Sequence, residues 1–278
     1  MIGRPFGSVT VVVPVTTRAL TLLLTEGGEA GEDRDDGDGD GDDDLYVLPD
    51  GVRRDGLPTV ARFYRNDDGR FAPDGDAGLD RIGGGTCAAA VDLDRDGRPD
   101  IVACDGSELA GAYRIRIAMN AGGRFVPRDP GPALTGLSAR AVAVGDVNAD
   151  GLPDIVISDG TVVRVALQTP DGGFTFTWQR RVTKVNGLAT GDADGDGDAD
   201  IFIVSGGATD QPDQLLVSAG DGRSFATIAV PGVARGSGDT ALMVDVDEDG
   251  RDEILVLNGE AGAGPIQLLD AEPAPSAG

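Results

Sequence analysis

Residues 92–101 read Asp-Leu-Asp-Arg-Asp-Gly-Arg-Pro-Asp-Ile, and variants of this stretch recur along the chain. Acidic or amide side chains occupy places one, three, five and nine, glycine occupies place six, and an aliphatic residue follows at place ten. Copies start at residues 36, 92, 146, 192 and 245. Recurrence at this spacing indicates a chain built from one structural unit used several times.

Each repeat is predicted to form four short strands. In residues 140–187, "RAVAVGD" leads into the acidic stretch and "DIVIS" leaves it, and "TVVRVALQ" and "FTFTWQRRV" follow. In residues 113–120, Ile115 and Ile117 alternate with Arg114 and Arg116, as expected of a half-buried strand. A period of 40 to 55 residues with four strands is typical of a propeller blade, and the 3.6-residue apolar spacing of a helical repeat is absent.

A second landmark decides how the predicted propeller closes. A glycine-containing turn ending at Phe71, Phe125, Phe174 or Phe225 follows the first four acidic stretches, and none follows the last. The chain opens instead with "GRPF" at 3–6, which matches "GRSF" at 222–225, so residues 6–14 are predicted to be a strand and not an export signal. The insertion at 25–34 is too short for another blade.

The predicted fold is therefore an all-β, five-bladed β-propeller. Its blades have four strands and start near 36, 92, 146, 192 and 245, and the N-terminal strand closes the last blade, which removes a free sheet edge. Residues 1–271 are expected to form a single domain, and residues 272–278 a disordered tail.

Composition excludes several classes of function. The 48 acidic residues outnumber the 23 basic ones, and the net charge of −25 argues against nucleic acid or an anionic membrane surface as partner. The chain has no histidine, which excludes Ser-His-Asp and Cys-His catalysis and histidine zinc sites. No run of 18 apolar residues occurs, so membrane insertion is not expected.

The acidic stretches have the pattern of a calcium site. Alternate side chains at places one, three and five point inward, glycine permits a sharp turn, and the carbonyl of place seven and the acid of place nine complete six or seven oxygen ligands. Such a set suits calcium better than zinc, copper or magnesium, and up to five ions are expected. The candidate ligands are Asp36, Asp38, Asp40, Asp44, Asp92, Asp94, Asp96, Asp100, Asp146, Asn148, Asp150, Asp154, Asp192, Asp194, Asp196, Asp200, Asp245, Asp247, Asp249 and Glu253.

These stretches have two alternatives to a calcium site. An EF-hand requires an acid at place twelve and flanking helices, but place twelve here holds valine, alanine or isoleucine. Polar turns without any ion are the simpler alternative, although each like-charge carboxylate pair then costs roughly 1–4 kcal/mol. Five copies with one ligand pattern favour calcium.

The repeated acidic stretch resembles the FG-GAP (or VCBS) repeats of integrin alpha-chain propellers and of many bacterial proteins. The resemblance covers nearly the whole chain and implies a calcium-stabilised propeller used for recognition or cell adhesion, often outside the cell. Two features depart from the integrin pattern: five repeats are present where integrins have seven blades, and Phe6-Gly7 is the only Phe-Gly pair. The ligand-binding face of integrins therefore cannot be transferred to this chain.

A ligand is expected on the side of the blades opposite the acidic stretches. Connections between strands two and three vary in length there, from "PDGVRRDGLPT" to "DG", and such variation is typical of a binding surface, although drifted surface loops would vary too. The candidate region comprises Arg53, Arg54 and the loops at 105–112 and 206–213. Arg180, Arg181 and Lys184 form a basic cluster that is expected to be a solvated outer strand.

Three functions remain open from sequence. The leading hypothesis is a monomeric, non-enzymatic, calcium-binding module that recognises a protein or a polysaccharide. The alternatives are a calcium-assisted polysaccharide lyase or hydrolase, with no catalytic residue identified, and a structural spacer. Secretion or attachment to the cell surface is expected from the calcium pattern. Cys87 and Cys104 flank one acidic stretch and are either bridged or free core cysteines.

Overall fold

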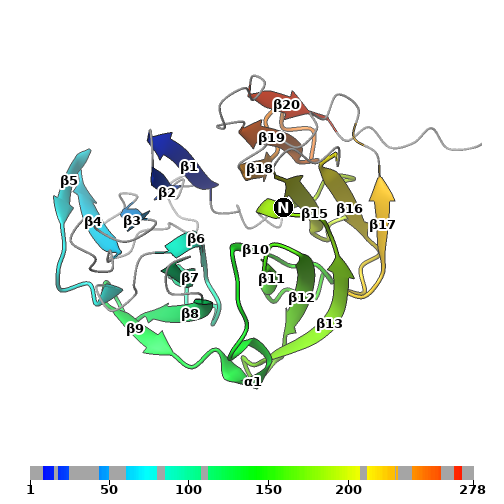
Figure 1. The fold of residues 1–278 in the computed structure, drawn as a ribbon. Coiled ribbons are helices and arrows are strands. Elements are labelled where there is room, and N and C mark those ends of the chain that lie inside the picture. Colours follow the sequence, from blue (N-terminus) through cyan, green and yellow to red (C-terminus); the bar gives the residue numbers. More distant parts are fainter. Residues whose placement is uncertain are drawn as a thin grey trace, which may run out of the picture. The chain divides into compact units, whose positions relative to one another are not determined.

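The computed structural model describes residues 9–15, 18–24, 44–49, 61–79, 85–107, 112–206, 212–228, 230, 240–257 and 266–270. Within these ranges the chain forms β-strands and a single helical turn, α1 (Gly131–Leu134). The strands make five antiparallel sheets that follow one another along the chain (Figure 1). The predicted fold class is confirmed: the protein is all-β and has five propeller blades.

Chain contacts divide the protein into two compact units, Met1–Val142 with Asp171–Phe174, and Ala143–Pro170 with Thr175–Gly278. The expectation of a single domain at 1–271 stays a prediction, and the predicted tail at 272–278 lies outside the described residues.

Two sheets lie in the first unit. The first contains β1 (Val9–Val15), β2 (Arg18–Leu24), β3 (Leu45–Pro49), β4 (Arg62–Asp67) and β5 (Arg70–Pro73) in that order. The second contains β6 (Gly85–Val91), β7 (Asp100–Ser107), β8 (Ala112–Asn120) and β9 (Phe125–Arg128). In both sheets each strand pairs with the next one in sequence, which is the meander expected of a blade.

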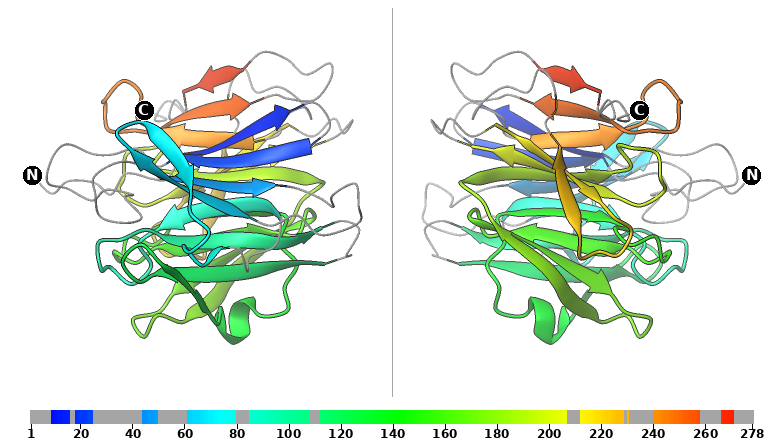
Figure 2. Two further views of the ribbon diagram at one scale, coloured as in Figure 1. Left: turned by 90° about the vertical axis from the view of Figure 1, so that its left-hand side faces the viewer. Right: turned by 90° about the vertical axis from the view of Figure 1, so that its right-hand side faces the viewer.

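The other three sheets repeat this pattern. The third contains β10 (Ala141–Gly145), β11 (Asp154–Ser158), β12 (Val162–Gln168) and β13 (Phe174–Arg181). The fourth contains β14 (Val185–Gly191), β15 (Asp200–Ser205), β16 (Gln214–Ser218) and β17 (Phe225–Ile228), and the fifth β18 (Thr240–Val244), β19 (Glu253–Leu257) and β20 (Gln267–Leu269). Side views show the alternating strand directions within each sheet (Figure 2).

The pairing predicted for the N-terminal strand is wrong and is corrected by the structure. β1 pairs with β2 from Val9↔Leu24 to Val15↔Arg18 and forms a fifth strand of the first sheet, and the last sheet contains only β18, β19 and β20 among the described residues. Only two residues separate the paired ends of β1 and β2, so little loop-closure entropy opposes this hairpin. The match of "GRPF" to "GRSF" carries no information about which partner strand β1 pairs with more favourably.

Burial follows the position of a strand in its sheet. All residues of the second strands β11 and β15 are buried, whereas β19, the second strand of the last sheet, alternates between half-buried and buried residues. The outer strand β5 is exposed throughout, and β13 keeps only Phe174 buried. The predicted alternation in β8 is confirmed, with Ile115 and Ile117 buried and Arg114 and Arg116 exposed.

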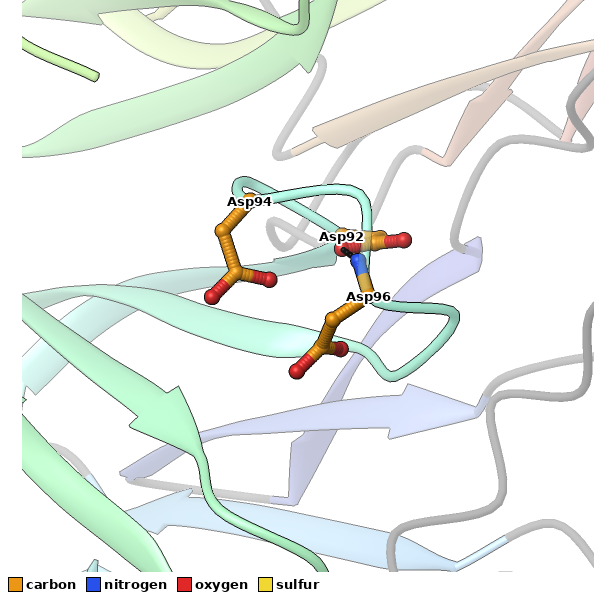
Figure 3. Close-up of side chains that lie close together, drawn as sticks. All are labelled: Asp92, Asp94 and Asp96. Atoms are coloured by element: carbon orange, nitrogen blue, oxygen red, sulfur yellow. Dashed lines mark hydrogen bonds between the residues drawn. The ribbon is translucent and has the colours of Figure 1, made fainter. Parts of the chain in front are cut away.

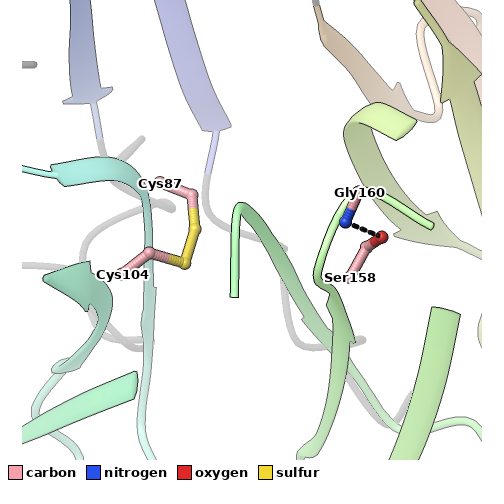
Figure 4. The surroundings of a disulfide bond; sticks show 4 residues. All are labelled: Cys87, Cys104, Ser158 and Gly160. Carbon is pink, nitrogen blue, oxygen red and sulfur yellow. Dashed lines mark hydrogen bonds between the residues drawn. A yellow bond between two sulfur atoms is a disulfide. The ribbon is translucent and has the colours of Figure 1, made fainter. Parts of the chain in front are cut away.

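A disulfide joins the first two strands of the second sheet. Cys87 in β6 lies directly opposite Cys104 in β7, with their Cα atoms 5.1 Å apart, and the two residues are bonded (Figure 4). This Cα separation lies within the range that a disulfide spans. The alternative left open by the sequence is thereby decided in favour of a bridge.

Candidate metal centre in the acidic loops

Each acidic stretch that the structure describes links the first two strands of its sheet. Residues 92–100 connect β6 to β7, and the stretches starting at 146, 192 and 245 do the same for β10 to β11, β14 to β15 and β18 to β19. In the first copy, Asp36, Asp38 and Asp40 lie outside the described residues, whereas Asp44 is described and is 5% exposed.

The four described loops share one backbone conformation. Place four is left-handed in each, at Arg95 (φ 60°), Ala149 (φ 53°), Gly195 (φ 81°) and Glu248 (φ 61°). Place six is left-handed as well, with φ between 81° and 96° for its glycines. The sequence analysis explained the glycine of place six but missed place four. Glycine at place four in two copies, Gly39 and Gly195, was the available signal.

The carboxylate of place one closes the loop on itself. The oxygens of Asp92 accept hydrogen bonds from the backbone N–H groups of Asp96 (3.1 Å) and Gly97 (2.8 Å). Asp146 and Asp245 accept the equivalent bonds, at 2.7–3.0 Å. Place one thus holds the turn, and a carboxylate that accepts two hydrogen bonds still has further lone pairs.

The acid of place nine ties the loop to the third strand of its sheet. Asp100 is 1% exposed, and its two oxygens accept the N–H groups of Leu93 (2.9 Å) and Asn120 (2.7 Å). The same pair of bonds is made by Asp154 with Val147 and Gln168, and by Asp200 with Ala193 and Ser218. Asp44 accepts the N–H of Asn66 at 2.9 Å. Place nine therefore has a structural role that the sequence analysis did not foresee.

Three loops bring carboxylates close enough to share an ion. Ligand oxygens of Asp92, Asp94 and Asp96 lie within 4.8 Å of one another (Figure 3). Asp192, Asp194 and Asp196 form the same group, whereas the last loop gathers Asp245, Asp247 and Glu253, which are places one, three and nine. Among the predicted ligands, places one, three and five are thus brought together in two loops, and place nine joins such a group in one.

The loop at 146 differs because place three is an amide. Nδ2 of Asn148 donates to Oδ2 of Asp150 at 2.9 Å. Its Oδ1, the predicted ligand atom, is buried and has no hydrogen-bond partner within the described structure. A buried oxygen without a donor is costly, and a cation would satisfy it.

Burial, and to a smaller extent neighbouring acids, raises the pKa of the place-nine carboxyl in two of these loops. Burial, followed by the neighbouring charges of Asp94 and Asp92, raises the pKa of Asp100 to about 6. Burial, with Asp146 and Asp150 nearby, raises the pKa of Asp154 to about 7. The loops therefore hold more negative charge than their own backbone donors compensate.

The loop at 192 contains a fifth acid that the sequence analysis missed. Asp198 at place seven is 4% exposed, and its Oδ1 has no hydrogen-bond partner in the described part of the chain. Burial, followed by the charge of Asp196, raises its pKa to about 6. The aspartate at place seven was the signal: the first copy has Asp42 there, whereas the other three carry Arg98, Leu152 and Arg251.

Backbone bonds connect successive loops in the second unit. The N–H of Ala199 donates to the carbonyl of Asp146, and the N–H of Asp252 donates to the carbonyl of Asp192, both at 2.8 Å. In each case place eight of one loop bonds to place one of the preceding loop. Gly191 permits the approach of Asp252, because a Cβ there would lie 2.4 Å from the Asp252 Oδ2 atom.

Comparison with known protein families supports the repeats that were identified in the sequence. A family model described as FG-GAP-like repeat matches residues 36–103, 146–203 and 192–256, which is more than half of the chain. No curated protein matches the chain by sequence. No helix of the described residues is long and apolar enough to cross a membrane.

One of two similar solved structures shares the fold with this chain at low sequence identity. It is an Agrocybe aegerita lectin studied for specific recognition of non-reducing terminal N-acetylglucosamine, with 18% identity, a TM-score of 0.52 and coverage of 90% of this chain. Another is the exo-β-1,3-galactanase of Phanerochaete chrysosporium with β-1,3-galactotriose, with 9% identity, a TM-score of 0.49 and coverage of 84% of this chain. The chain spans 65% of the lectin chain and 60% of the galactanase chain.

Proposed function

The chain belongs to the family of FG-GAP-like repeat proteins, and from this premise we propose that it is a calcium-binding β-propeller that recognises a protein or a polysaccharide without catalysis. The observation that carries the proposal is the acidic loop, which recurs at the same position in four described sheets with one backbone conformation.

The residues of the loops fit calcium. Every candidate donor is an oxygen, and two loops gather three aspartates of places one, three and five. Among the described residues, no hydrogen-bond donor reaches one buried side-chain oxygen of Asn148 and one of Asp198, and a cation would compensate both. Six to eight oxygen ligands in a flexible loop are typical of calcium sites.

The proposed role of the ion is structural. A bound calcium ion supplies positive charge between the carboxylates and relieves their repulsion. The protein's own groups hold the loop around it: place one accepts the N–H groups of places five and six, and place nine fixes the loop to the third strand. Binding only to the folded chain stabilises it by mass action.

Recognition is proposed at the strand ends opposite the acidic loops. The loops there vary in length between repeats, whereas the acidic loops keep theirs. Arg53, Arg54 and much of the 105–112 and 206–213 loops lie outside the described residues. We also propose secretion or surface exposure, because the Cys87–Cys104 disulfide is typical of an oxidising compartment.

Thermal unfolding with and without calcium tests the metal site. At a calcium concentration 100 times the Kd, one site adds about 2.7 kcal/mol, which corresponds to a rise in Tm of roughly 5–10 °C. Asp94→Asn should reduce this rise because it removes one ligand charge. In excess chelator the same variant should be as stable as the parent or more stable, since a repulsion is relieved.

Asp76→Asn is the matched control, because it removes one exposed charge from a residue outside the acidic loops. Its response to calcium should equal that of the parent protein. A Tm that chelation leaves unchanged would sink the calcium assignment. Glycan-array binding compared with turnover of polyuronides separates a recognition module from an enzyme, and turnover would contradict the non-catalytic proposal.

A further inference from the structure

A pocket of about 410 Å³ lies in the second unit between the outer strands of the third and fourth blades. Arg180, Arg181, Val182 and Thr183 line it from the end of β13. Pro212, Gln214 and Thr227 line it from β17 and the start of β16. Its volume lies in the range of small-ligand sites.

The pocket lies at the strand ends opposite the acidic loops. β14 runs from Val185 toward the loop at 192, so the segment 182–184 precedes the far end of that strand. β15 leaves the same loop and ends at Ser205, so Pro212 also belongs to the far side. The pocket therefore lies on the side where the sequence predicted a ligand.

Two cations line this pocket, and a third lies close in sequence, in a chain of net charge −25. Arg180 and Arg181 line the pocket, and Lys184 follows three residues later. None of the three forms an ion pair with a carboxylate among the residues that the structure describes. Other arginines do, as Arg116 with Asp105 and Arg164 with Asp159, each at 3.0 Å.

Asp213, the described acid nearest in sequence to the pocket, already accepts a hydrogen bond. Asp213 lies between two lining residues but is 5% exposed, and its Oδ1 accepts the N–H of Ser205 at 2.7 Å. Asp159 accepts Nη1 of Arg164 at 3.0 Å. Because no carboxylate of the described residues pairs with Arg180 or Arg181, both guanidinium groups can bind an anionic ligand.

Backbone bonds hold the rim of the pocket in place. The N–H of Val182 donates to the carbonyl of Thr161 at 2.9 Å, and the N–H of Gly206 donates to that of Lys184 at 2.8 Å. Nη1 of Arg180 donates to Oγ1 of Thr227 at 2.7 Å, which orients its guanidinium. A preorganised rim lowers the entropy cost of binding.

We propose that this pocket binds an acidic saccharide through a carboxylate or sulfate group, which names the ligand class of the proposed recognition function and rests on it. Guanidinium groups of Arg180 and Arg181 match the geometry of such oxyanions. The hydroxyls of Thr183 and Thr227 and the amide of Gln214 can bond sugar hydroxyls. A concave site of this volume, with hydroxyl and amide groups beside the cations, suits a saccharide, and the hexaglutamate probe below tests the alternative of an acidic peptide.

Isothermal titration in saturating calcium tests the proposal with four probes: trigalacturonate, a sulfated chondroitin disaccharide, neutral maltotriose and a hexaglutamate peptide. We expect trigalacturonate, the sulfated disaccharide or both to bind. Binding of trigalacturonate shows that a carboxylate is sufficient, and binding of the sulfated disaccharide alone shows that the sulfate is required. Arg180→Gln with Arg181→Gln should weaken binding at least tenfold. Arg70→Gln with Arg124→Gln removes the same charge from exposed positions elsewhere and should change the Kd less than twofold.

Each other result overturns the inference. If both double variants weaken binding equally, the effect is diffuse electrostatics. If maltotriose binds as tightly as the acidic saccharides, the cations do not select the ligand. If hexaglutamate binds as tightly, the glycan is not what is recognised. Absence of binding by both acidic saccharides also contradicts it. The Tm of the same samples with calcium and with chelator reports separately on the calcium site, so failure of the pocket leaves that result intact.

Discussion

At the scale of single residues, Asp213 is a buried acid whose charge is poorly compensated. It is 5% exposed, and burial raises its pKa to about 6 in spite of the hydrogen bond from the N–H of Ser205. An acid whose folded pKa exceeds its ordinary value stabilises the fold fully only below that ordinary value, and this stability is lost as the pH rises through 6.

Asp213→Asn should therefore raise the free energy of unfolding at neutral pH by about 1–3 kcal/mol, since the amide keeps an oxygen acceptor without the charge. At pH 4 the difference between the two proteins should shrink toward zero. Denaturant unfolding at pH 4 and pH 7.5 in saturating calcium measures both values. A difference that does not depend on pH would show that the charge of Asp213 is not the cause.

Most of the candidate site could be predicted from the sequence because its candidate ligands follow one another within nine residues. Places one, three and five could be read from alternation, and the structure brings them together in the loops at 92 and 192. The structural role of place nine could not be predicted from this alternation. The bonds of Asp100 to Leu93 and Asn120 join segments up to 20 residues apart, so they depend on how the third strand packs.

At the scale of structural elements, local periodicity predicted the strands but not every pairing. The strands of the third sheet were identified because their apolar runs are bounded by turn residues. The position of β1 depends on competition between a neighbouring partner and one more than 200 residues away, and the match of "GRPF" to "GRSF" carries no information on that free-energy difference.

Neighbouring acidic loops are expected to stabilise each other through the backbone bond from Ala199 to Asp146. Place eight is proline in two other copies, Pro99 and Pro153, so the loop conformation accepts a proline ring, but proline has no N–H to donate. Ala199→Pro should lower stability by about 1 kcal/mol, and the Tm by roughly 2–4 °C, through loss of this one bond.

Differential scanning calorimetry of the calcium-loaded protein measures the effect. Ala199→Ser keeps the N–H donor and serves as control, with a Tm closer to that of the parent. If the proline variant is as stable as the serine variant, the bond between the loops contributes nothing. A loss far above 1 kcal/mol would indicate instead that the loop at 192 cannot accept the ring.

At the scale of the whole molecule, negative charge is both concentrated and excessive. The chain carries 48 acidic residues, and five calcium ions would reduce its net charge from −25 to about −15. Self-repulsion of this kind opposes the compact state, and salt screens it over about 10 Å at 0.1 M and about 3 Å at 1 M ionic strength.

The calcium-free protein is therefore expected to be stabilised by sodium chloride. Raising the salt from 0.1 M to 1 M in excess chelator should increase the Tm by roughly 2–8 °C, equivalent to about 1–2 kcal/mol, because repulsion within and between the loops is screened. The same increase in salt should have a smaller effect on the calcium-loaded protein, whose loops are already compensated. Calorimetry at matched pH measures both responses. Equal changes in Tm with and without calcium would mean that the excess charge acts across the whole surface and not in the loops. A fall in Tm on adding salt to the calcium-free protein would mean that ion pairs such as Arg65 with Asp74 outweigh the repulsion.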